Sequence, residues 1–241
     1  MDVYWLEQTD ADVPAENDWL AAGEILRLNG LRFAKRRNDW RLGRWTAKRA
    51  LALSLGMPAN RKVFAEIEIR PAPSGAPEVY VGGQPAKLTI SLSHRAGMAA
   101  CAVARCRAEL GCDLEAIEPR SDAFVADYFT AEEQGLAARA PAVDRFRLLA
   151  LIWSAKESAL KALHEGLRLD PRSVIVSPDH STFDLHGWSP LEARHADGRV
   201  FRGWWQDADS MVRTLVAAPP PDPPIRLRIV DYVSDAASLC V

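Results

Sequence analysis

The sequence is poor in cysteine, with four in 241 residues. Cys101, Cys106, Cys112 and Cys240 are scattered, and no histidine cluster stands near them at zinc-ligand spacing. This usage excludes a disulfide scaffold and does not indicate redox chemistry. Free cysteines of this kind are most often small, buried hydrophobic residues.

A strong excess of charge and a long apolar run are also lacking. The 30 Lys and Arg and 32 Asp and Glu give a formal net charge of −2, so the molecule as a whole does not attract nucleic acid. No apolar stretch approaches the ~20 residues that span a bilayer. Residues 1–10 lack the basic start and apolar core of a secretory signal. We therefore expect a cytoplasmic protein without nucleic-acid or membrane partners.

What is present is an order of elements that occurs twice. The first set of patterns is a helix over about 39–55 and strands over 63–69, 88–93, 98–104 and 109–115. The second set is a helix over about 143–164, stopped by Gly166, and strands over 173–177, 200–206 and 211–217. This order predicts an α+β fold of two similar halves, each with a long helix on a small sheet.

We divide the chain into residues 1–110, 111–218 and a proline-rich linker with a C-terminal extension over 219–241. A last strand is possible at 225–233. The junction of the two halves is the natural place for a ligand site.

Two acidic residues occur in Gly111-Cys112-Asp113-Leu114-Glu115 at positions i and i+2. On a strand, this spacing points Asp113 and Glu115 to the same face. Two such carboxylates repel unless a cation lies between them, and hard oxygen ligands suit Mg²⁺. The alternative is a solvated strand face, which is common for an isolated acidic pair.

A third acid interrupts the apolar stripe of the second long helix. Phe146, Leu149, Trp153, Leu160 and His164 follow the helical period, and Glu157 falls among them. An unpaired buried charge is costly, so we expect Glu157 to face a metal, a cation or a polar cleft. The alternative is a plain helix salt bridge with Lys161, four residues on.

Two further features suit a phosphorylated ligand. Ser93 and His94 end an alternating strand, where hydroxyl, imidazole and backbone N–H groups could hold a phosphate. A densely basic run is made up of Arg32, Lys35, Arg36, Arg37, Arg41, Arg44, Lys48 and Arg49. Arginine's planar fork suits phosphate, although such runs are usually solvated faces. Together with the acids, these residues predict one site for a metal and a multiply phosphorylated ligand.

The two acidic segments resemble the marks of the 4′-phosphopantetheinyl transferase superfamily. These marks are G-(I/V/C)-D-(L/I/V)-E and W-(S/T/C)-x-K-E-(S/A)-x-x-K, separated by about forty residues. Here they read as residues 111–115 and Trp153-Ser154-Ala155-Lys156-Glu157-Ser158-Ala159-Leu160-Lys161. The length of the chain is similar to that of the two-halved, monomeric branch that activates peptide and polyketide synthases. The resemblance implies two subdomains related by a pseudo-two-fold axis.

The resemblance also implies an activity and a set of site residues. The activity is Mg²⁺-dependent transfer of phosphopantetheine from coenzyme A to a serine of an acyl or peptidyl carrier protein, releasing 3′,5′-adenosine bisphosphate. The implied Mg²⁺ ligands are Asp113, Glu115 and Glu157, and Glu157 is also placed to accept the serine proton. The residues implied to contact coenzyme A are Lys156, Lys161, Ser93, His94, Arg37 and Arg44. Glu133 resembles a further acid of the family whose role the sequence leaves open.

One position departs from the family pattern. Gly75-Ala76-Pro77 stands where the family often has Gly-Lys-Pro, whose lysine contacts coenzyme A. Arg70 or Lys87 could substitute for it. Two other functions use the same residues: a metal-dependent phosphohydrolase of nucleotide diphosphates, and a non-catalytic paralogue that binds carrier proteins. The carrier itself is not indicated by the sequence.

Overall fold

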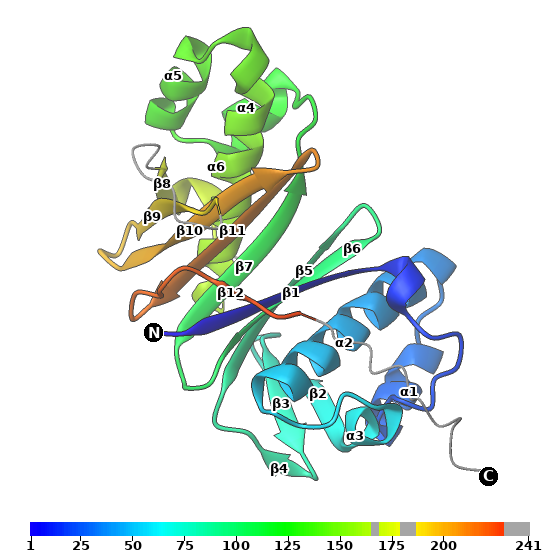
Figure 1. Ribbon diagram of the computed structural model, residues 1–241. Helices are drawn as coiled ribbons and strands as arrows, with labels where there is room; N and C mark the ends of the chain where they lie inside the picture. The colour runs from blue at the N-terminus through cyan, green and yellow to red at the C-terminus, as the bar shows by residue number, and fades with distance from the viewer. Residues whose placement is uncertain (165–168, 179–186, 229–241) are drawn as a thin grey trace, which may run out of the picture.

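The structure, a computed structural model, describes residues 1–164, 169–178 and 187–228. Two mixed helix-and-sheet halves lie side by side, and each has one long helix against a sheet (Figure 1). The predicted α+β class with two similar halves is confirmed. Within the described residues, no helix has the length and hydropathy that crossing a bilayer requires.

The N-terminal half contains three helices and two small sheets. Its helices are α1 (Ala22–Asn29), α2 (Ala34–Ser54) and α3 (Arg61–Glu66). Its strands are β1 (Val3–Thr9), β2 (Ile67–Pro71), β3 (Pro77–Val81), β4 (Gln84–Pro85), β5 (Thr89–Arg95) and β6 (Met98–Ala104). One sheet has the order β12-β1-β6-β5 and the other β2-β3-β4, where β12 (Ile225–Arg226) runs parallel to β1.

The C-terminal half builds one antiparallel sheet in the order β7-β11-β10-β9-β8. Its strands are β7 (Glu109–Ala116), β8 (Val174–Pro178), β9 (Ser189–His195), β10 (Val200–Ala208) and β11 (Met211–Ala218). Its helices are α4 (Asp122–Tyr128), α5 (Ala131–Arg139) and α6 (Ala142–Ala162). Helix α6 packs against β7 and β11 and is buried on most sides from Leu149 onward, whereas its first two turns are partly exposed.

A buried lysine–glutamate pair occupies the same place in each half. In the N-terminal half, Glu24 in the first turn of α1 accepts from the backbone N–H groups of Ala21 (3.0 Å) and Ile69 (3.1 Å). Lys48 of α2 pairs with Glu24 and donates to the carbonyls of Trp19 (3.1 Å) and Phe64 (2.9 Å). The pair therefore ties the short helix, the long helix and the first strand after it together.

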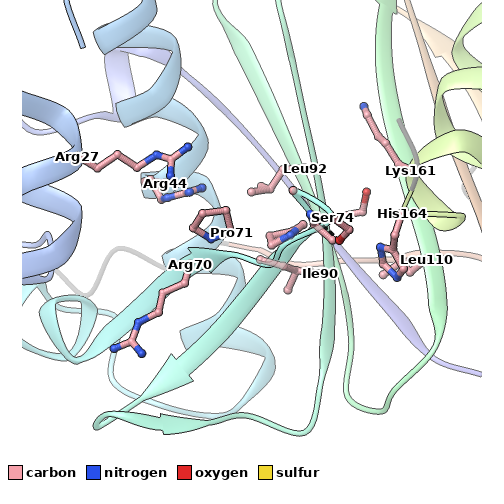
Figure 2. Close-up of a pocket in the computed structure, with 14 residues that line it drawn as sticks. Arg27, Arg44, Arg70, Pro71, Ser74, Ile90, Leu92, Leu110, Lys161 and His164 are labelled. Carbon is pink, nitrogen blue, oxygen red and sulfur yellow. Dashed lines mark hydrogen bonds between the residues drawn. The ribbon is translucent and has the colours of Figure 1, made fainter. Parts of the chain in front are cut away.

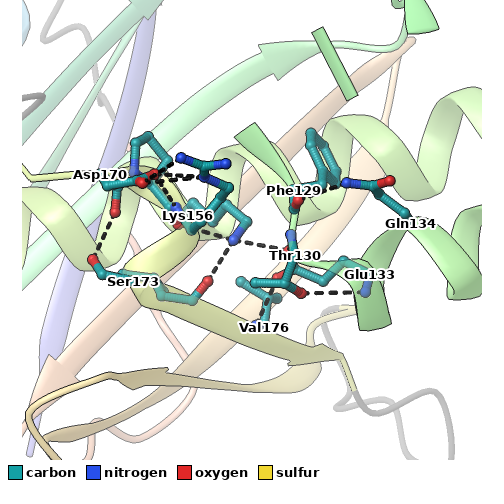
Figure 3. Close-up of polar contacts among 11 residues, drawn as sticks. Phe129, Thr130, Glu133, Gln134, Lys156, Asp170, Ser173 and Val176 are labelled. Atoms are coloured by element: carbon teal, nitrogen blue, oxygen red, sulfur yellow. Dashed lines mark hydrogen bonds and ion pairs between the residues drawn. The ribbon is translucent and has the colours of Figure 1, made fainter. Parts of the chain in front are cut away.

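The C-terminal half repeats this arrangement (Figure 3). Glu133 of α5 accepts from the N–H groups of Thr130 (2.8 Å) and Val176 (3.0 Å) and pairs with Lys156 of α6 at 2.9 Å. The fully buried Nζ of Lys156 also donates to the carbonyls of Pro171 (3.0 Å) and Val174. Burial lowers the pKa of both lysines, against the attraction of their glutamates. A shared internal pair of this kind supports the two-fold repeat where sequence identity between the halves is not visible.

Several predicted boundaries shift. The predicted strand over 63–69 is wrong in its first part, because the Asn60 side chain caps the start of α3 by accepting from Val63 N–H and the strand begins only at Ile67. Helix α2 begins at Ala34, earlier than expected. Helix α6 ends at Ala162, and the predicted stop at Gly166 lies outside the described residues. Of the predicted strand at 225–233, only β12 lies within the described residues as a strand.

The two halves are joined by an apolar cluster and by side-chain hydrogen bonds. The cluster contains Val3, Trp5, Ala100, Ala102, Ala104, Leu110, Cys112, Leu114, Trp188, Met211, Leu215 and Ala217, which come from both halves. At its margin, the hydroxyl oxygens of Ser91 and Ser93 on β5 accept from the N–H groups of Cys112 (2.9 Å) and Leu114 (3.2 Å) on β7. Strand β5 is thus held beside β7 by serine side chains.

Helix α6 crosses β7 with no side chain between them at Gly111. A Cβ atom at this position would lie 1.7 Å from the carbonyl oxygen of Ser158 and 2.8 Å from the backbone nitrogen of Ala162. These are backbone atoms of a packed helix, so they cannot move aside cheaply. Glycine at the start of the 111–115 segment is therefore a packing requirement.

We expect Gly111→Ala to lower the free energy of unfolding by at least about 3 kcal/mol, because the helix must move away from the strand. The matched control is Gly43→Ala in α2, where an added Cβ meets nothing within 4 Å. That change should stabilise the protein by roughly 0.5–1 kcal/mol through helix propensity. Urea unfolding measures both. Equal effects of the two substitutions would contradict the packing argument.

We expect Lys156→Met to cost about 3–5 kcal/mol, because it leaves the Glu133 carboxylate buried without its cation. Adding Glu133→Gln to this variant should restore part of the lost stability. Lys87→Met, at an exposed position, is the control and should stay within about 0.5 kcal/mol of the parent. A Lys156→Met protein as stable as the control in urea would show that the buried pair contributes nothing.

Candidate metal and phosphate site

Asp113 lies at the seam between the halves, on β7. Its Oδ1 atom accepts from Ser93 Oγ (2.7 Å) and from Lys161 Nζ (2.7 Å), and the residue is 5% exposed. Its Oδ2 atom is buried and has no hydrogen-bond partner. One carboxylate oxygen is thus fixed by both neighbouring elements, while the other is left for a ligand.

Glu157 approaches the same point from α6. Its Oε1 atom is also buried without a hydrogen-bond partner. Burial, together with the negative charges of Asp113 and Glu115, raises the pKa of Glu157 to about 6. The helix salt bridge considered from the sequence does not form, because Lys161 donates to Asp113 and to the carbonyl of Cys112 (3.0 Å) instead.

Lys161 provides positive charge between the acids. Burial lowers its pKa, but the charges of Asp113, Cys112 and Glu157 and the hydrogen bond to Asp113 outweigh this effect, so its pKa lies above the ordinary lysine value. The ammonium group therefore stays charged at neutral pH.

Glu115 lies on the same face of β7 as Asp113, as the i, i+2 spacing predicts, but its carboxylate is neutralised by arginine. Its Oε1 atom accepts from Arg120 Nη2 (2.5 Å) and lies 3.3 Å from Arg95 Nε. Burial raises the pKa of Glu115, against the attraction of Arg120.

These acids fit a divalent cation in part. The unpartnered oxygens of Asp113 and Glu157 are hard ligands from two separate elements, and burial together with the neighbouring acids raises the pKa of Glu157. In the described part of the chain, no three Asp, Glu, His or Cys side chains already converge as a metal site. Asp113 and Glu157 each offer an unpartnered oxygen to a cation, whereas Glu115 is held by arginines through its Oε1 atom.

A cavity of about 350 Å³ opens beside Lys161 and reaches into the N-terminal half (Figure 2). Its lining residues include Arg27 of α1 and Arg44 of α2, whose guanidinium groups point toward each other in Figure 2. Burial lowers the pKa of Arg44, partly offset by Glu24, and the charge of Arg27 lowers it further. Arg44 Nε lies 3.6 Å from Glu24 Oε1, and the guanidinium groups of Arg27 and Arg44 together suit an anionic group such as a phosphate.

The position that departs from the family pattern, Ala76, lines this same cavity. Arg70 also lines it, but its guanidinium group pairs with Glu68 (2.6 Å), stacks on Tyr80 at 4.0 Å and points away from Lys161 in Figure 2. Lys87 is exposed and is not among the lining residues. Neither residue takes the place of the missing lysine in this structure.

The other predicted contacts lie elsewhere. His94 is about half exposed, lies 4.0 Å from Asp39 and lines another cavity, of about 780 Å³. Its partial burial, with the charges of Lys161 and Lys35, lowers its pKa. Arg37 is exposed and donates to the carbonyl of Leu31 (3.2 Å).

Lys156 is not at the site, because its ammonium group is used up in the buried pair with Glu133. Its three acceptors leave no Nζ proton for a phosphate. The structure therefore gives both residues a structural role: Lys156, which the resemblance implies near the phosphates, and Glu133, whose role the sequence left open.

The sequence reasoning missed three arginines of the site, Arg27, Arg95 and Arg120. Arg27 was missed because the short helix α1 was not predicted. Arg95 directly follows Ser93-His94, and Arg120 stands five residues after Glu115. That proximity was the available signal.

Comparisons with known proteins agree with this geometry. A family model described as the 4′-phosphopantetheinyl transferase superfamily matches residues 109–204. A relative, the 4′-phosphopantetheinyl transferase HetI of Nostoc sp. strain PCC 7120, is 27% identical over 192 residues, which cover 78% of each protein.

Two solved structures are also similar to part of the chain. A holo-(acyl-carrier-protein) synthase from Bacillus anthracis, in complex with coenzyme A (3′,5′-ADP), is 22% identical with a TM-score of 0.36, covering 42% of this chain and 92% of that one. The holo-[acyl-carrier-protein] synthase of Helicobacter pylori, in complex with coenzyme A, is 20% identical with a TM-score of 0.34, covering 42% of this chain and 96% of that one.

The matched residues 109–204 contain β7 with Asp113 and Glu115 and α6 with Glu157 and Lys161, so the family model and the site geometry rest on the same segments. Over these residues the chain is similar to the 4′-phosphopantetheinyl transferase superfamily.

Proposed function

We propose that this enzyme transfers the 4′-phosphopantetheine group from coenzyme A to a serine of an acyl or peptidyl carrier protein, in a Mg²⁺-dependent reaction. The observation that carries the proposal is the acidic cluster of Asp113 and Glu157 around Lys161, open to a cavity lined by arginines. The name of the Nostoc relative and the coenzyme A complexes of the two synthases support the same chemistry.

Coenzyme A carries phosphate at two places, a diphosphate and a 3′-phosphate on the ribose. Arg27 and Arg44 lie at the end of the cavity remote from the acids and suit the 3′-phosphate. Lys161 lies at the other end, between Asp113 and the cavity, and suits the diphosphate. The cavity thus has cationic groups at both of its ends.

In the transfer, a bond forms between the serine oxygen of the carrier and the β-phosphorus of coenzyme A, and the bond from that phosphorus to 3′,5′-adenosine bisphosphate breaks. The serine proton goes to Glu157, which has a buried, unpartnered oxygen at this point and is therefore placed to accept it. Lys161 offsets the negative charge that develops on the phosphate oxygens.

Two residues prepare this arrangement. Asp113 holds the ammonium group of Lys161 in place, and Ser93 holds Asp113 from the N-terminal half. Asp113 and Glu157 would hold Mg²⁺ through their unpartnered oxygens. Bound there, the ion supplies neutralisation of the diphosphate charge and polarises its oxygens.

Asp113→Asn and Glu157→Gln should each reduce transfer by at least about a hundredfold, the usual effect of removing a general base or an electrostatic partner. The protein is incubated with coenzyme A, Mg²⁺ and an apo carrier protein, and the carrier is weighed by mass spectrometry. Asp18→Asn, in an exposed ion pair with Arg61, is the control and should act as the parent does.

The outcomes of this assay separate the three functions. A carrier heavier by one phosphopantetheine supports the transferase, and its repetition with several carriers identifies the preferred one. Release of adenosine bisphosphate without a change in carrier mass would instead favour the phosphohydrolase. Carrier binding with neither product would favour the non-catalytic paralogue.

Metal affinity should depend on the protonation of Glu157. Its pKa of about 6 in the metal-free protein means that lowering the pH through 6 protonates the carboxylate, and a cation must then displace that proton. We expect the affinity for Mn²⁺ to fall by up to about tenfold per pH unit below pH 6 and to level off above pH 7.

Titration of Mn²⁺ by electron paramagnetic resonance measures this dependence, and Glu157→Gln should flatten it. A parent protein whose Mn²⁺ affinity is constant between pH 5 and 7 would remove Glu157 from the site.

A further inference from the structure

Glu115 differs from the other two acids of the site in its partners. Asp113 and Glu157 each keep one buried oxygen without a hydrogen-bond partner. Glu115 Oε1 instead accepts from Arg120 at 2.5 Å and lies 3.3 Å from Arg95. The acid that the 111–115 motif offers as a further ligand is therefore already neutralised.

Arg120 is built into this position. It lies in the segment between β7 and α4, its side chain is only 14% exposed, and its Nη1 atom is 3.9 Å from Glu118. Its guanidinium carbon lies 5.0 Å from the centre of the Phe124 ring, and its buried Nε atom has no hydrogen-bond partner. The bond to Glu115 is thus the shortest contact that holds this cation, with an aromatic ring as its support.

A divalent cation and a guanidinium group cannot share one carboxylate oxygen without repulsion between them. A cation that Asp113 and Glu157 hold and that also contacts Glu115 would lie close to the guanidinium group of Arg120. On Oε1 of Glu115 the cation would displace Arg120 from that atom, and on the other carboxylate oxygen it would still be repelled by the guanidinium charge. Each contact is therefore made at the expense of the other.

We propose that Arg120 is a positioning residue that withholds Glu115 from the metal, so that Asp113 and Glu157 take the cation first and Glu115 joins only when Arg120 releases it. This inference rests on the proposed metal-dependent function, because it concerns the same site. Arg120 tunes metal affinity and prevents repulsion among the three acids before the cation arrives.

Phe124 extends this restraint to helix α4. Its ring packs on Tyr128 and on Trp153, each with ring centres 4.9 Å apart, and Trp153 stands one turn before Glu157 on α6. The ring under Arg120 is therefore fixed by the same helix that carries the metal-binding acid. Loosening Phe124 should loosen the hold of Arg120 on Glu115.

The test is Mn²⁺ binding to the protein alone, followed by electron paramagnetic resonance at pH 7.5. Arg120→Gln should bind Mn²⁺ roughly tenfold more tightly than the parent, since a competing charge has been removed. Phe124→Leu should give a smaller gain in the same direction. Arg145→Gln removes a similar arginine, paired with Asp122 at the start of α4, and should leave Mn²⁺ affinity unchanged.

A double-mutant cycle separates release of Glu115 from a general change of charge. In a Glu115→Gln background, Arg120→Gln should give no further gain, because there is no carboxylate left to release. A gain of equal size in that background would overturn the inference, as would unchanged or weaker Mn²⁺ binding by Arg120→Gln itself.

A second variant guards against misfolding of Arg120→Gln, and a separate activity assay distinguishes failure of this inference from failure of the proposed function. If Arg120→Gln unfolds, Arg120→Lys keeps the charge but loses the planar fork, and it should still raise Mn²⁺ affinity, by less; no gain there overturns the inference. Carrier modification by the parent protein is scored separately. A parent that transfers phosphopantetheine while Arg120 has no effect on Mn²⁺ binding overturns this inference alone.

Discussion

Helix α6 rests directly on strand β7 at Gly111, and the positions of the proposed catalytic groups depend on this contact. Because no side chain separates the two elements, Glu157 and Lys161 on the helix come within reach of Asp113 on the strand. Ser93 then fixes the same carboxylate from the N-terminal half. The close approach of α6 to β7 therefore sets the positions of the acids and of the lysine relative to one another. In the motif over residues 111–115, the glycine lies where the backbones of α6 and β7 touch, and the acids lie at the seam between the two halves.

The sequence predicts which acidic residues lie at this site better than it predicts the contacts that those residues make. The i, i+2 spacing placed Asp113 and Glu115 correctly on one strand face, because strand geometry is local. The same local pattern could not tell that Lys156, one residue from Glu157, turns to the opposite side and is buried with Glu133. Nor could it show that Glu115 faces arginines, since those contacts depend on the path of the segment after β7. For the fold, β6 was predicted to the residue, whereas β1, α1, α4, α5 and β9 were missed because their patterns are short or mixed.

The two halves share their internal support but not their chemistry. Each has a long helix locked by a buried lysine to a glutamate at the start of a shorter helix. On β1, however, the strand that corresponds to β7, the acidic residue is Glu7, which is bound by Arg213 of β11 at 2.6 and 2.9 Å. One half uses its acid to bind the other half, and the other uses its acids at the site. The two halves thus share a scaffold but differ at the candidate site. The N-terminal half contributes the cavity arginines Arg27 and Arg44, and the C-terminal half contributes the carboxylates of Asp113 and Glu157.

Strand β12 gives the chain an unusual order of assembly. It lies parallel to β1, and the nearby Met1 amino group contacts the Pro220 carbonyl (3.0 Å) and Asp222 (3.2 Å), so the segment that leaves the C-terminal half returns to the first strand. The C-terminal half is therefore enclosed in sequence between two pieces of the N-terminal sheet. During synthesis on the ribosome, β1, β5 and β6 can pair early, but the outer edge of β1 stays uncovered until residues 225–226 emerge. A fragment that ends near residue 110 would keep Arg27 and Arg44 but would lack β12, so the outer edge of β1 would be exposed. Exposed strand edges of this kind promote aggregation.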